Sequence, residues 1–284
     1  GSKFVAAATC YPDNPLDILH SAGSVIKQAI PVGIILTLSA TGSEMNSNAV
    51  ITHKSAKTKY HFSSERLFPA FAVLDPTKTF SLAPRQIANG VVDSFVHIIE
   101  QYLTYPVNGH VQDRFAESLL QILIELGPKA VTHPEDYETR GNLMWVATMA
   151  LNGLIGAGVP QDWATHQIGH ELTTLYNIDH ARTLAIVLPG MLTVRKDAKR
   201  QKLLQYATRV WGLTEGDDNQ RIDKAIARTR QFFESMGVET RLSIYGVKNI
   251  DKVLAQLEAH NLTALGEHKD VTLAVSRQVL EHCL

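Results

Sequence analysis

Several titratable residues in this 284-residue sequence are spaced so that they could hold a metal ion. Asp93 and His97 are four residues apart, His166 and His170 repeat that spacing, and His180 follows soon after. Residues i and i+4 lie on one face of a helix, so each pair can present two ligands to the same ion. The spacing does not establish that the two pairs meet. A solvated polar face for Asp93 and His97, and isolated histidines elsewhere, are the alternatives.

The second histidine pair also raises the question of a metal hydrolase. The zincin signature is His-Glu-x-x-His, in which the glutamate activates a water molecule. In the stretch from His166 to His170, Gln167 occupies the position of that glutamate. The sequence therefore argues against hydrolysis.

A second informative segment is 36–44, where an apolar run leads into Thr37, Thr41, a glycine and Ser43. Hydroxyls and backbone N–H groups after a buried strand suit a phosphate or a ribose. An ordinary polar turn is the alternative, and neither G-x-G-x-x-G nor the P-loop motif is present. Lys59 lies in a polar, hairpin-like stretch, where a solvated lysine is the default interpretation.

The elements that must position these residues change in kind near residue 82. Before that point, short apolar runs alternate with turn residues, which predicts strands of an α/β sheet. The continuous apolar run from Ile34 suits a strand that is buried on both faces. The predicted strands are residues 4–8, 34–38, 49–52 and 70–74.

After Pro84 the apolar residues recur every three or four positions, which predicts helices. Pro84 suits the first turn of the first of them. We expect Gly127-Pro128 to end one helix, and Pro189-Gly190 to end or kink another. The predicted helical segments are 84–102, 111–126, 137–155, 162–176, 180 to about 189, 197–211, 222–236, 250–260 and a tail from 271.

Composition narrows the function further. The chain has 27 Lys+Arg against 28 Asp+Glu, a formal net charge of −1, which argues against a nucleic-acid partner. Hydrophobic residues make up 45% of the chain, enough for a folded core. Two cysteines suit a reducing cytoplasm. We see no run long enough for a membrane span.

Three stretches together resemble the iron-containing (group III) alcohol dehydrogenases: residues 89–97, 158–166 and 179–185. Within that family the chain is most similar to the NADPH-dependent aldehyde reductase and butanol dehydrogenase branch. The resemblance covers essentially the whole chain. It implies an α/β plus all-α fold, dehydroquinate synthase-like, with part of a Rossmann-like cofactor domain at 1–82 and a helical metal-binding domain at 83–284. It also implies a homodimer.

The resemblance implies roles for the candidate residues. By position, the family's divalent ion would be bound by Asp93, His97, His166 and His180, and would be Fe²⁺ or Zn²⁺. His170 would line the active site as a proton relay without binding the ion.

Four further residues match positions where family members contact the dinucleotide: Thr37, Thr41, Ser43 and Lys59. The implied reaction is hydride transfer between NADP(H) and a small aldehyde or primary alcohol, with NAD(H) the less favoured cofactor.

One departure bears on these expectations. Family members carry further N-terminal residues, including a glycine-rich loop that holds the pyrophosphate, and this chain begins after that loop. We therefore expect it to bind NADPH weakly by itself. The alternatives are a polyol (glycerol-type) dehydrogenase of the same superfamily, and a truncated metal-binding fragment without catalysis.

Overall fold

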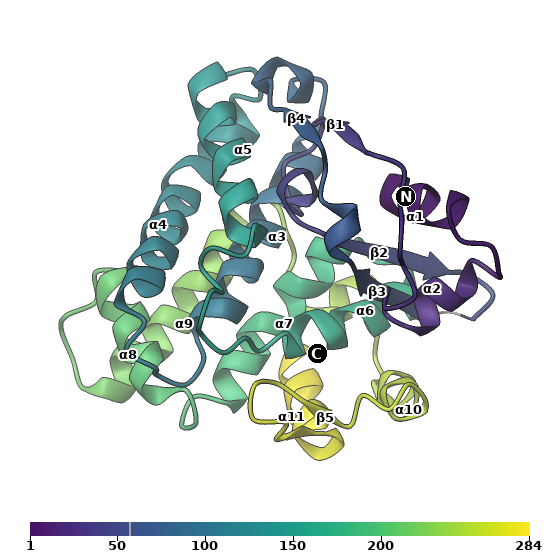
Figure 1. Ribbon diagram of the computed structural model, residues 1–284. Helices are drawn as coiled ribbons and strands as arrows, with labels where there is room; N and C mark the ends of the chain where they lie inside the picture. Colours follow the sequence, from purple (N-terminus) through teal and green to yellow (C-terminus); the bar gives the residue numbers. More distant parts are fainter. Residues whose placement is uncertain (57) are drawn as a thin grey trace.

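The computed structural model describes residues 1–56 and 58–284. Figure 1 shows a large helical body, with the N-terminal segments on one side and the C-terminal helices below. The helices are α1 Ser2–Thr9, α2 Leu16–His20, α3 Pro84–Tyr102, α4 His110–Thr132, α5 Tyr137–Leu151, α6 Ala164–Tyr176, α7 His180–Val194, α8 Arg200–Arg209, α9 Asp218–Ser235, α10 Asp251–Ala259 and α11 Leu273–Cys283.

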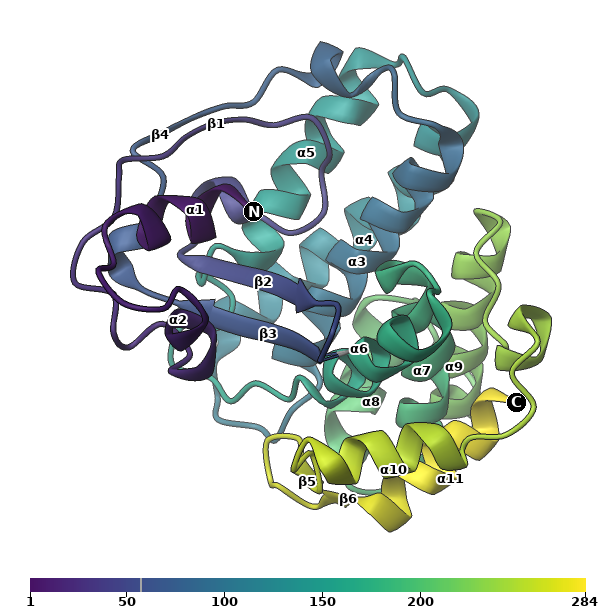
Figure 2. The same cartoon turned by 90° about the vertical axis from the view of Figure 1, so that its right-hand side faces the viewer.

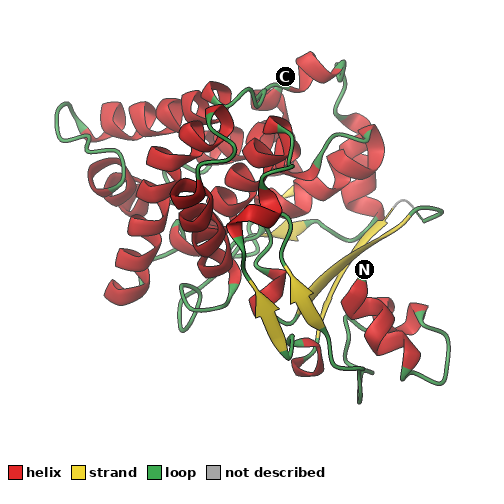
Figure 3. Cartoon of the chain, turned by 90° about the horizontal axis from the view of Figure 1, so that it is seen from above, coloured by secondary structure: helices red, strands yellow, loops and turns green. Residues whose placement is uncertain are grey.

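Six short strands accompany these helices. They are β1 Gly33–Ile35, β2 Asn48–His53, β3 Thr58–Ser63, β4 Phe71–Val73, β5 Ala264–Leu265 and β6 Val271–Thr272. β1 pairs with β4 in parallel, while β2–β3 and β5–β6 are antiparallel pairs. Figure 3 shows the longer strands on the side of the N-terminal helices, apart from the main helical body, whereas β5 and β6 lie beside α10 and α11 (Figure 2).

The centre of the helical body is α3, which is buried from Ile87 to Tyr102. Pro84 occupies its first turn, where a missing N–H costs nothing. The main hydrophobic core surrounds this helix and includes Phe95, Leu120 and Phe233. Because α4, α5, α6 and α7 all contact α3, polar residues on it lie inside the protein.

Two smaller cores hold the flanking segments. The β2–β3 hairpin packs on α1 and α2 through Phe62, Ala7 and Ile18. A second helical core joins α10 and α11 to α6 and α7. Figure 2 shows the hairpin reaching α6 from one side and the C-terminal helices below it. α6 is thus fixed by neighbours on several sides.

Two expectations about the first part of the chain were wrong. Residues 4–8, predicted as a strand, lie in α1, because their alanines favour a helix and an apolar run of this length does not distinguish the two. The strand at Ile34 is not buried on both faces. Ile35 beside it is 62% exposed, because the described residues leave one face of the β1–β4 pair uncovered.

The predicted helix end at Gly127-Pro128 was also wrong, and at Pro189-Gly190, where we expected an end or a kink, the helix does not end. α4 continues through Gly127-Pro128, and α7 continues through Pro189-Gly190. The glycines permit close packing: a Cβ on Gly127 would lie 2.8 Å from Val91 Cγ1, and one on Gly190 would lie 2.8 Å from the Val279 carbonyl oxygen. Tertiary packing therefore outweighs the local helix-breaking signal at both places.

Among the described residues, we find no helix whose length and apolar character would let it cross a bilayer.

Candidate metal centre

Three helices carry the histidines and the aspartate that the sequence singled out. Asp93 and His97 lie on α3, His166 and His170 on α6, and His180 is the first residue of α7. α6 and α7 pack against each other and are joined by a short turn in which Asn177 is left-handed, with φ 53°. This turn brings His180 back beside the helix that carries His166.

The side chains of Asp93, His166 and His180 converge. Asp93 Oδ1 lies 3.6 Å from His180 Nε2 and 4.0 Å from His166 Nε2. One ligand atom of each residue lies within 4.8 Å of the other two, a grouping able to hold a metal ion. The two helical pairs, whose meeting the spacing did not establish, do meet in space.

His97 and His170 border this group without belonging to it. His97 Nδ1 lies 3.8 Å from Asp93 Oδ2, and its ring stacks on His166 with centroids 4.7 Å apart. The His170 ring is 4.9 Å from the His180 ring and 6.2 Å from the His166 ring, both between centroids. All five predicted residues are thus neighbours.

Polar atoms of this group lack hydrogen-bond partners. Asp93 Oδ1, His166 Nε2 and His97 Nδ1 are buried, and none has a partner among the described residues. Buried polar atoms without partners are uncommon in folded proteins and call for an explanation. Carboxylate oxygen and imidazole nitrogen are ligands that Fe²⁺ and Zn²⁺ accept, so this donor set fits a divalent ion.

Glu100 holds His166 in place. Its Oε2 is hydrogen-bonded to His166 Nδ1, and its Oε1 accepts from the backbone N–H of Thr165 at 2.6 Å. A carboxylate on Nδ1 fixes the tautomer and leaves the Nε2 lone pair facing Asp93. The sequence analysis assigned no role to Glu100. The signal for its role was its register with Asp93 and His97 on an otherwise apolar helix.

Burial sets the protonation states. It raises the pKa of Asp93 to about 6, against the opposing effects of His166 and Lys59. It lowers the pKa of His97, His170 and His180 well below 6.5, so these rings are neutral near pH 7. Neutral imidazoles are the form that binds metal.

His166 differs from the other three histidines in the direction of its pKa shift. Burial lowers its pKa, but the Glu100 and Asp93 carboxylates more than offset this, and the net pKa lies above the usual value.

The alternative of a solvated polar face does not hold for α3. Asp93 is 3% exposed and His97 is 5% exposed. A buried carboxylate and imidazole need partners. Their polar neighbours are each other and the histidines of α6 and α7, at 3.6–4.0 Å, which is too far for a hydrogen bond and leaves room for an ion between them.

Trp163 is a further neighbour that sequence reasoning missed. Its ring meets His166 edge-to-face at 5.3 Å and His97 at 6.2 Å, between centroids. Its backbone is left-handed, with φ 65°, an outlier for a bulky residue. No sequence signal marks such a position.

The predicted cofactor residues lie on two segments. Thr37 and Thr41 are exposed and Ser43 is half-buried, on the loop from β1 to the 3₁₀ turn Ser43–Met45. Lys59 is half-buried on β3. Its pKa is lowered by burial and raised by the nearby Asp93 carboxylate, so Lys59 lies within the electrostatic influence of the metal group. The side chains of the four residues form no hydrogen bond to one another in the described part of the chain.

Close packing fixes the loop itself. A Cβ on Gly90 of α3 would lie 2.2 Å from the Ser39 carbonyl oxygen, so the loop rests directly on the helix that carries Asp93. On the other side, Thr148 of α5 donates to Glu44 Oε1 at 2.5 Å. Asn46 donates to the Leu151 carbonyl at 3.2 Å. The polar turn is thus anchored to two helices.

Two family models match the chain. The model described as "Iron-containing alcohol dehydrogenase" matches residues 1–76, and "Fe-containing alcohol dehydrogenase family, C-terminal" matches residues 87–280. Together they account for most of the sequence.

Individual relatives in the sequence comparison are alcohol dehydrogenases and an aldehyde reductase. The NADPH-dependent aldehyde reductase YqhD of Escherichia coli is 59% identical over 285 residues, spanning 99% of this chain and 74% of the relative. NADH-dependent butanol dehydrogenase A of Clostridium acetobutylicum is 37% identical over 87% of this chain. The chain spans 64% of the length of that relative.

Solved structures show the same fold. The crystal structure of E. coli YqhD matches with a TM-score of 0.97 and 57% identity, over 99% of this chain and 73% of that one. NADH-dependent butanol dehydrogenase A of Thermotoga maritima matches with a TM-score of 0.93 and 31% identity, over 99% and 72% of the two chains. On sequence and on fold alike, the chain belongs to the iron-containing alcohol dehydrogenase family.

Proposed function

We propose that the chain acts as a metal-dependent oxidoreductase, an aldehyde reductase or alcohol dehydrogenase that transfers a hydride between NADP(H) and an aldehyde or primary alcohol. The observation that carries the proposal is the convergence of Asp93, His166 and His180, with buried ligand atoms that lack other partners. The names of the relatives supply the reaction.

The ligand set we propose is Asp93, His97, His166 and His180. A divalent ion there supplies Lewis acidity toward a carbonyl oxygen. His97 completes the set because its Nδ1 is unpartnered and lies beside Asp93. Glu100 orients His166, and the neutral rings of His97 and His180 keep lone pairs available.

For His170 we propose a proton-transfer role. It lies one turn from His166, beside His180 and outside the convergent group. Burial keeps its imidazole neutral near pH 7, so one ring nitrogen can accept a proton while the other donates one. It would hold or move the proton of the alcohol oxygen.

For the cofactor we propose contacts from Thr37, Thr41, Ser43 and Lys59. Two exposed threonines and a serine on an anchored loop offer hydroxyl donors to a dinucleotide. Lys59 is near enough to Asp93 to feel its charge, and it can contact a phosphate or a ribose. NADP(H) is proposed over NAD(H) because the relative with the higher identity is named as NADPH-dependent.

Further proposals concern the whole molecule. The resident ion is Fe²⁺ or Zn²⁺, the chain assembles as a homodimer, and it acts in the cytoplasm. Residues 1–82 form the cofactor-binding part and residues 83–284 the metal-binding domain. A polyol dehydrogenase, or a metal-binding fragment without turnover, remains the alternative.

Metal content tests the ligand assignment. We expect the chain reconstituted with Zn²⁺ or Fe²⁺ to hold about one ion, and His166→Ala to lose most of it, because a four-ligand site loses a direct bond. His133→Ala, an exposed histidine at the end of α4, is the matched control and should retain the ion. Equal metal content in the wild type and His166→Ala, measured by elemental analysis, would overturn the assignment.

Turnover tests the reaction. NADPH oxidation should be faster with butanal than NAD⁺ reduction is with glycerol, at matched substrate concentrations. The reverse order would favour the polyol alternative. Metal binding without turnover of either substrate would favour the fragment.

A further inference from the structure

Arg140, on α5, is a buried cation with no carboxylate partner. It is 5% exposed, and no Asp or Glu oxygen lies within ion-pair distance of its guanidinium among the described residues. Its Nε and Nη2 donate to the Thr79 hydroxyl and carbonyl, each at 3.1 Å. Nη1 makes no hydrogen bond within the described chain.

A buried charge without a partner is costly to the folded state. Most acids or bases escape this cost by changing their protonation state, but a guanidinium remains charged in proteins. Burial lowers the pKa of Arg140, and no neighbouring anion raises it. An anion in contact with the free Nη1 would offset this cost.

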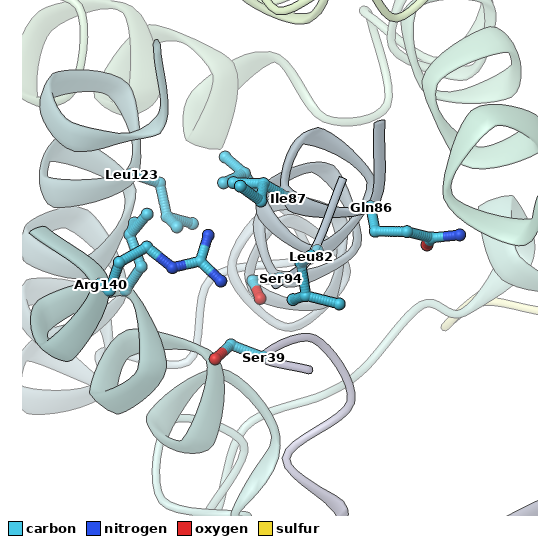
Figure 4. Close-up of a pocket in the computed structure, with 10 residues that line it drawn as sticks. Ser39, Leu82, Gln86, Ile87, Ser94, Leu123 and Arg140 are labelled. Carbon is cyan, nitrogen blue, oxygen red and sulfur yellow. The ribbon is translucent and has the colours of Figure 1, made fainter. Parts of the chain in front are cut away.

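The guanidinium faces a small pocket between α3, α5 and the Ser39 loop, which we call the Arg140 pocket. Figure 4 shows Arg140 directed into the pocket, with its charged end turned toward Ser94 and Leu82. Ser39 lies below it in this view, on the neighbouring loop. Leu82, Ile87 and Leu123 supply apolar walls. The Ser39 hydroxyl has no hydrogen-bond partner among the described residues, so it has a free donor.

The free space limits what can enter. The pocket holds about 20 Å³, and a cavity of 10–15 Å³ accommodates roughly one water-sized particle. A phosphate or sulfate group does not fit wholly inside this space, whereas a single halide ion does. Gln86 and Ser94 also line the pocket, so polar groups stand beside its apolar walls.

We propose that the Arg140 pocket binds one monovalent halide ion of chloride size, held by the Arg140 guanidinium and the Ser39 hydroxyl. The bound ion neutralises Arg140 and joins α5 to the Ser39 loop across α3. The site is separate from the metal group and does not rest on the proposed reaction.

Bromide locates the site directly, because it mimics chloride and scatters anomalously. Crystals of the 284-residue chain grown in sodium bromide should show an anomalous peak in the Arg140 pocket. A pocket that holds water only, in crystals where bromide occupies other sites, would overturn the proposal.

Thermal unfolding tests the site in solution, in sodium chloride against sodium gluconate at equal ionic strength. Above the dissociation constant, we expect the melting temperature to rise by roughly 3 °C for each tenfold increase in chloride. Arg140→Met should abolish this rise. If the chloride-dependent rise is unchanged in Arg140→Met, the proposal is wrong.

Arg230→Met is the matched control. Arg230 also donates to a threonine carbonyl and hydroxyl, those of Thr240 at 3.0 and 2.8 Å, but Glu234 is close enough to supply an opposite charge. This variant should retain the chloride response. If Arg140→Met does not fold, Ser39→Ala is tested instead. We expect this variant to need a several-fold higher chloride concentration for half of the rise in melting temperature. If the concentration needed by Ser39→Ala is unchanged, the role of Ser39 and the proposal are both wrong.

Discussion

Glu100 controls the metal group through a single histidine. It is 3% exposed, and it contacts both the ring and the backbone at the start of α6. Because its carboxylate fixes the tautomer of His166, its effect on an ion would pass through the Nε2 lone pair. This arrangement gives Glu100 a measurable role even though it is not a ligand.

We expect Glu100→Ala to weaken Zn²⁺ binding by about 10- to 100-fold, the range for loss of an outer hydrogen-bond partner. Competition with a chelator measures this affinity. Glu117→Ala is the control, because Glu117 is equally buried but pairs with Tyr102 and Arg209 away from the metal group. Wild-type affinity in Glu100→Ala would contradict the orienting role.

Replacing His170 should lower the rate of the reaction without affecting metal binding. We expect His170→Ala to keep its ion and to lower kcat on the order of 10²-fold, because it removes a proton-transfer group beside the substrate oxygen. Added imidazole should restore part of the rate. Loss of the ion in this variant would show instead that His170 is a ligand.

At the scale of elements, the contact between α3 and the Ser39 loop depends on Gly90. A methyl group there would lie 2.2 Å from a backbone oxygen, so Gly90→Ala must displace the loop. We expect a loss of about 1–3 kcal/mol in unfolding free energy, measured by urea denaturation. NADPH affinity should fall as well, because the loop carries Thr37 and Thr41.

Gly141→Ala provides the comparison. Gly141 lies inside α5, where a Cβ would meet Pro76 Cγ at an ordinary 3.4 Å. Alanine favours the helix there by about 0.5–1 kcal/mol. A Gly90→Ala variant as stable as Gly141→Ala would show that the loop moves at no cost.

The helices were largely predictable, because apolar residues recur every three or four positions in the sequence. α3 begins at Pro84, as its pattern indicated. The pattern could not predict the structural role of Gly127-Pro128 and Gly190. Locally these residues break helices, but in the folded chain they allow another element to approach. Such contacts depend on residues far away in sequence.

The candidate site was predictable in part for the same reason. The i, i+4 spacing identified Asp93/His97 and His166/His170 as pairs, and the family resemblance related them to His180. The convergence itself depends on how α6 and α7 pack against α3, which no spacing rule contains. The hydrogen bonds that Glu100 accepts and the left-handed backbone of Trp163 could be found only in the structure.

At the scale of the molecule, the β1–β4 pair leaves an apolar surface uncovered. Ile35 and Val73 are paired across the two strands, and Phe71 lies over Gly33 on the same face. Ile35 and Phe71 are each 62% exposed and Val73 is 43% exposed. Parallel strands are usually covered on both faces, and bare apolar patches favour association.

We therefore expect the 284-residue chain to self-associate with rising concentration. The double variant Ile35→Thr, Phe71→Thr should reduce this, because it removes two large apolar side chains while keeping residues that suit strands. Light scattering over a concentration series measures it. Ile244→Thr is the control, since Ile244 is 63% exposed at a separate place. If Ile244→Thr reduces self-association as much as the double variant does, the β1–β4 face is not the surface through which the chain associates.

The capping of α6 has a consequence for the order in which the protein folds. α6 has no side-chain cap from Trp163, and the N–H of Thr165 is accepted by Glu100, a residue 65 positions earlier. One cap is local, since Asp162 Oδ1 accepts from the N–H of Ala164 at 3.0 Å, but the cap from Glu100 belongs to a segment that leaves the ribosome before α6. α6 and its two histidines can nucleate on a surface that already exists, whereas a peptide of residues 162–177 alone would lack the Glu100 cap and should remain largely unstructured in water.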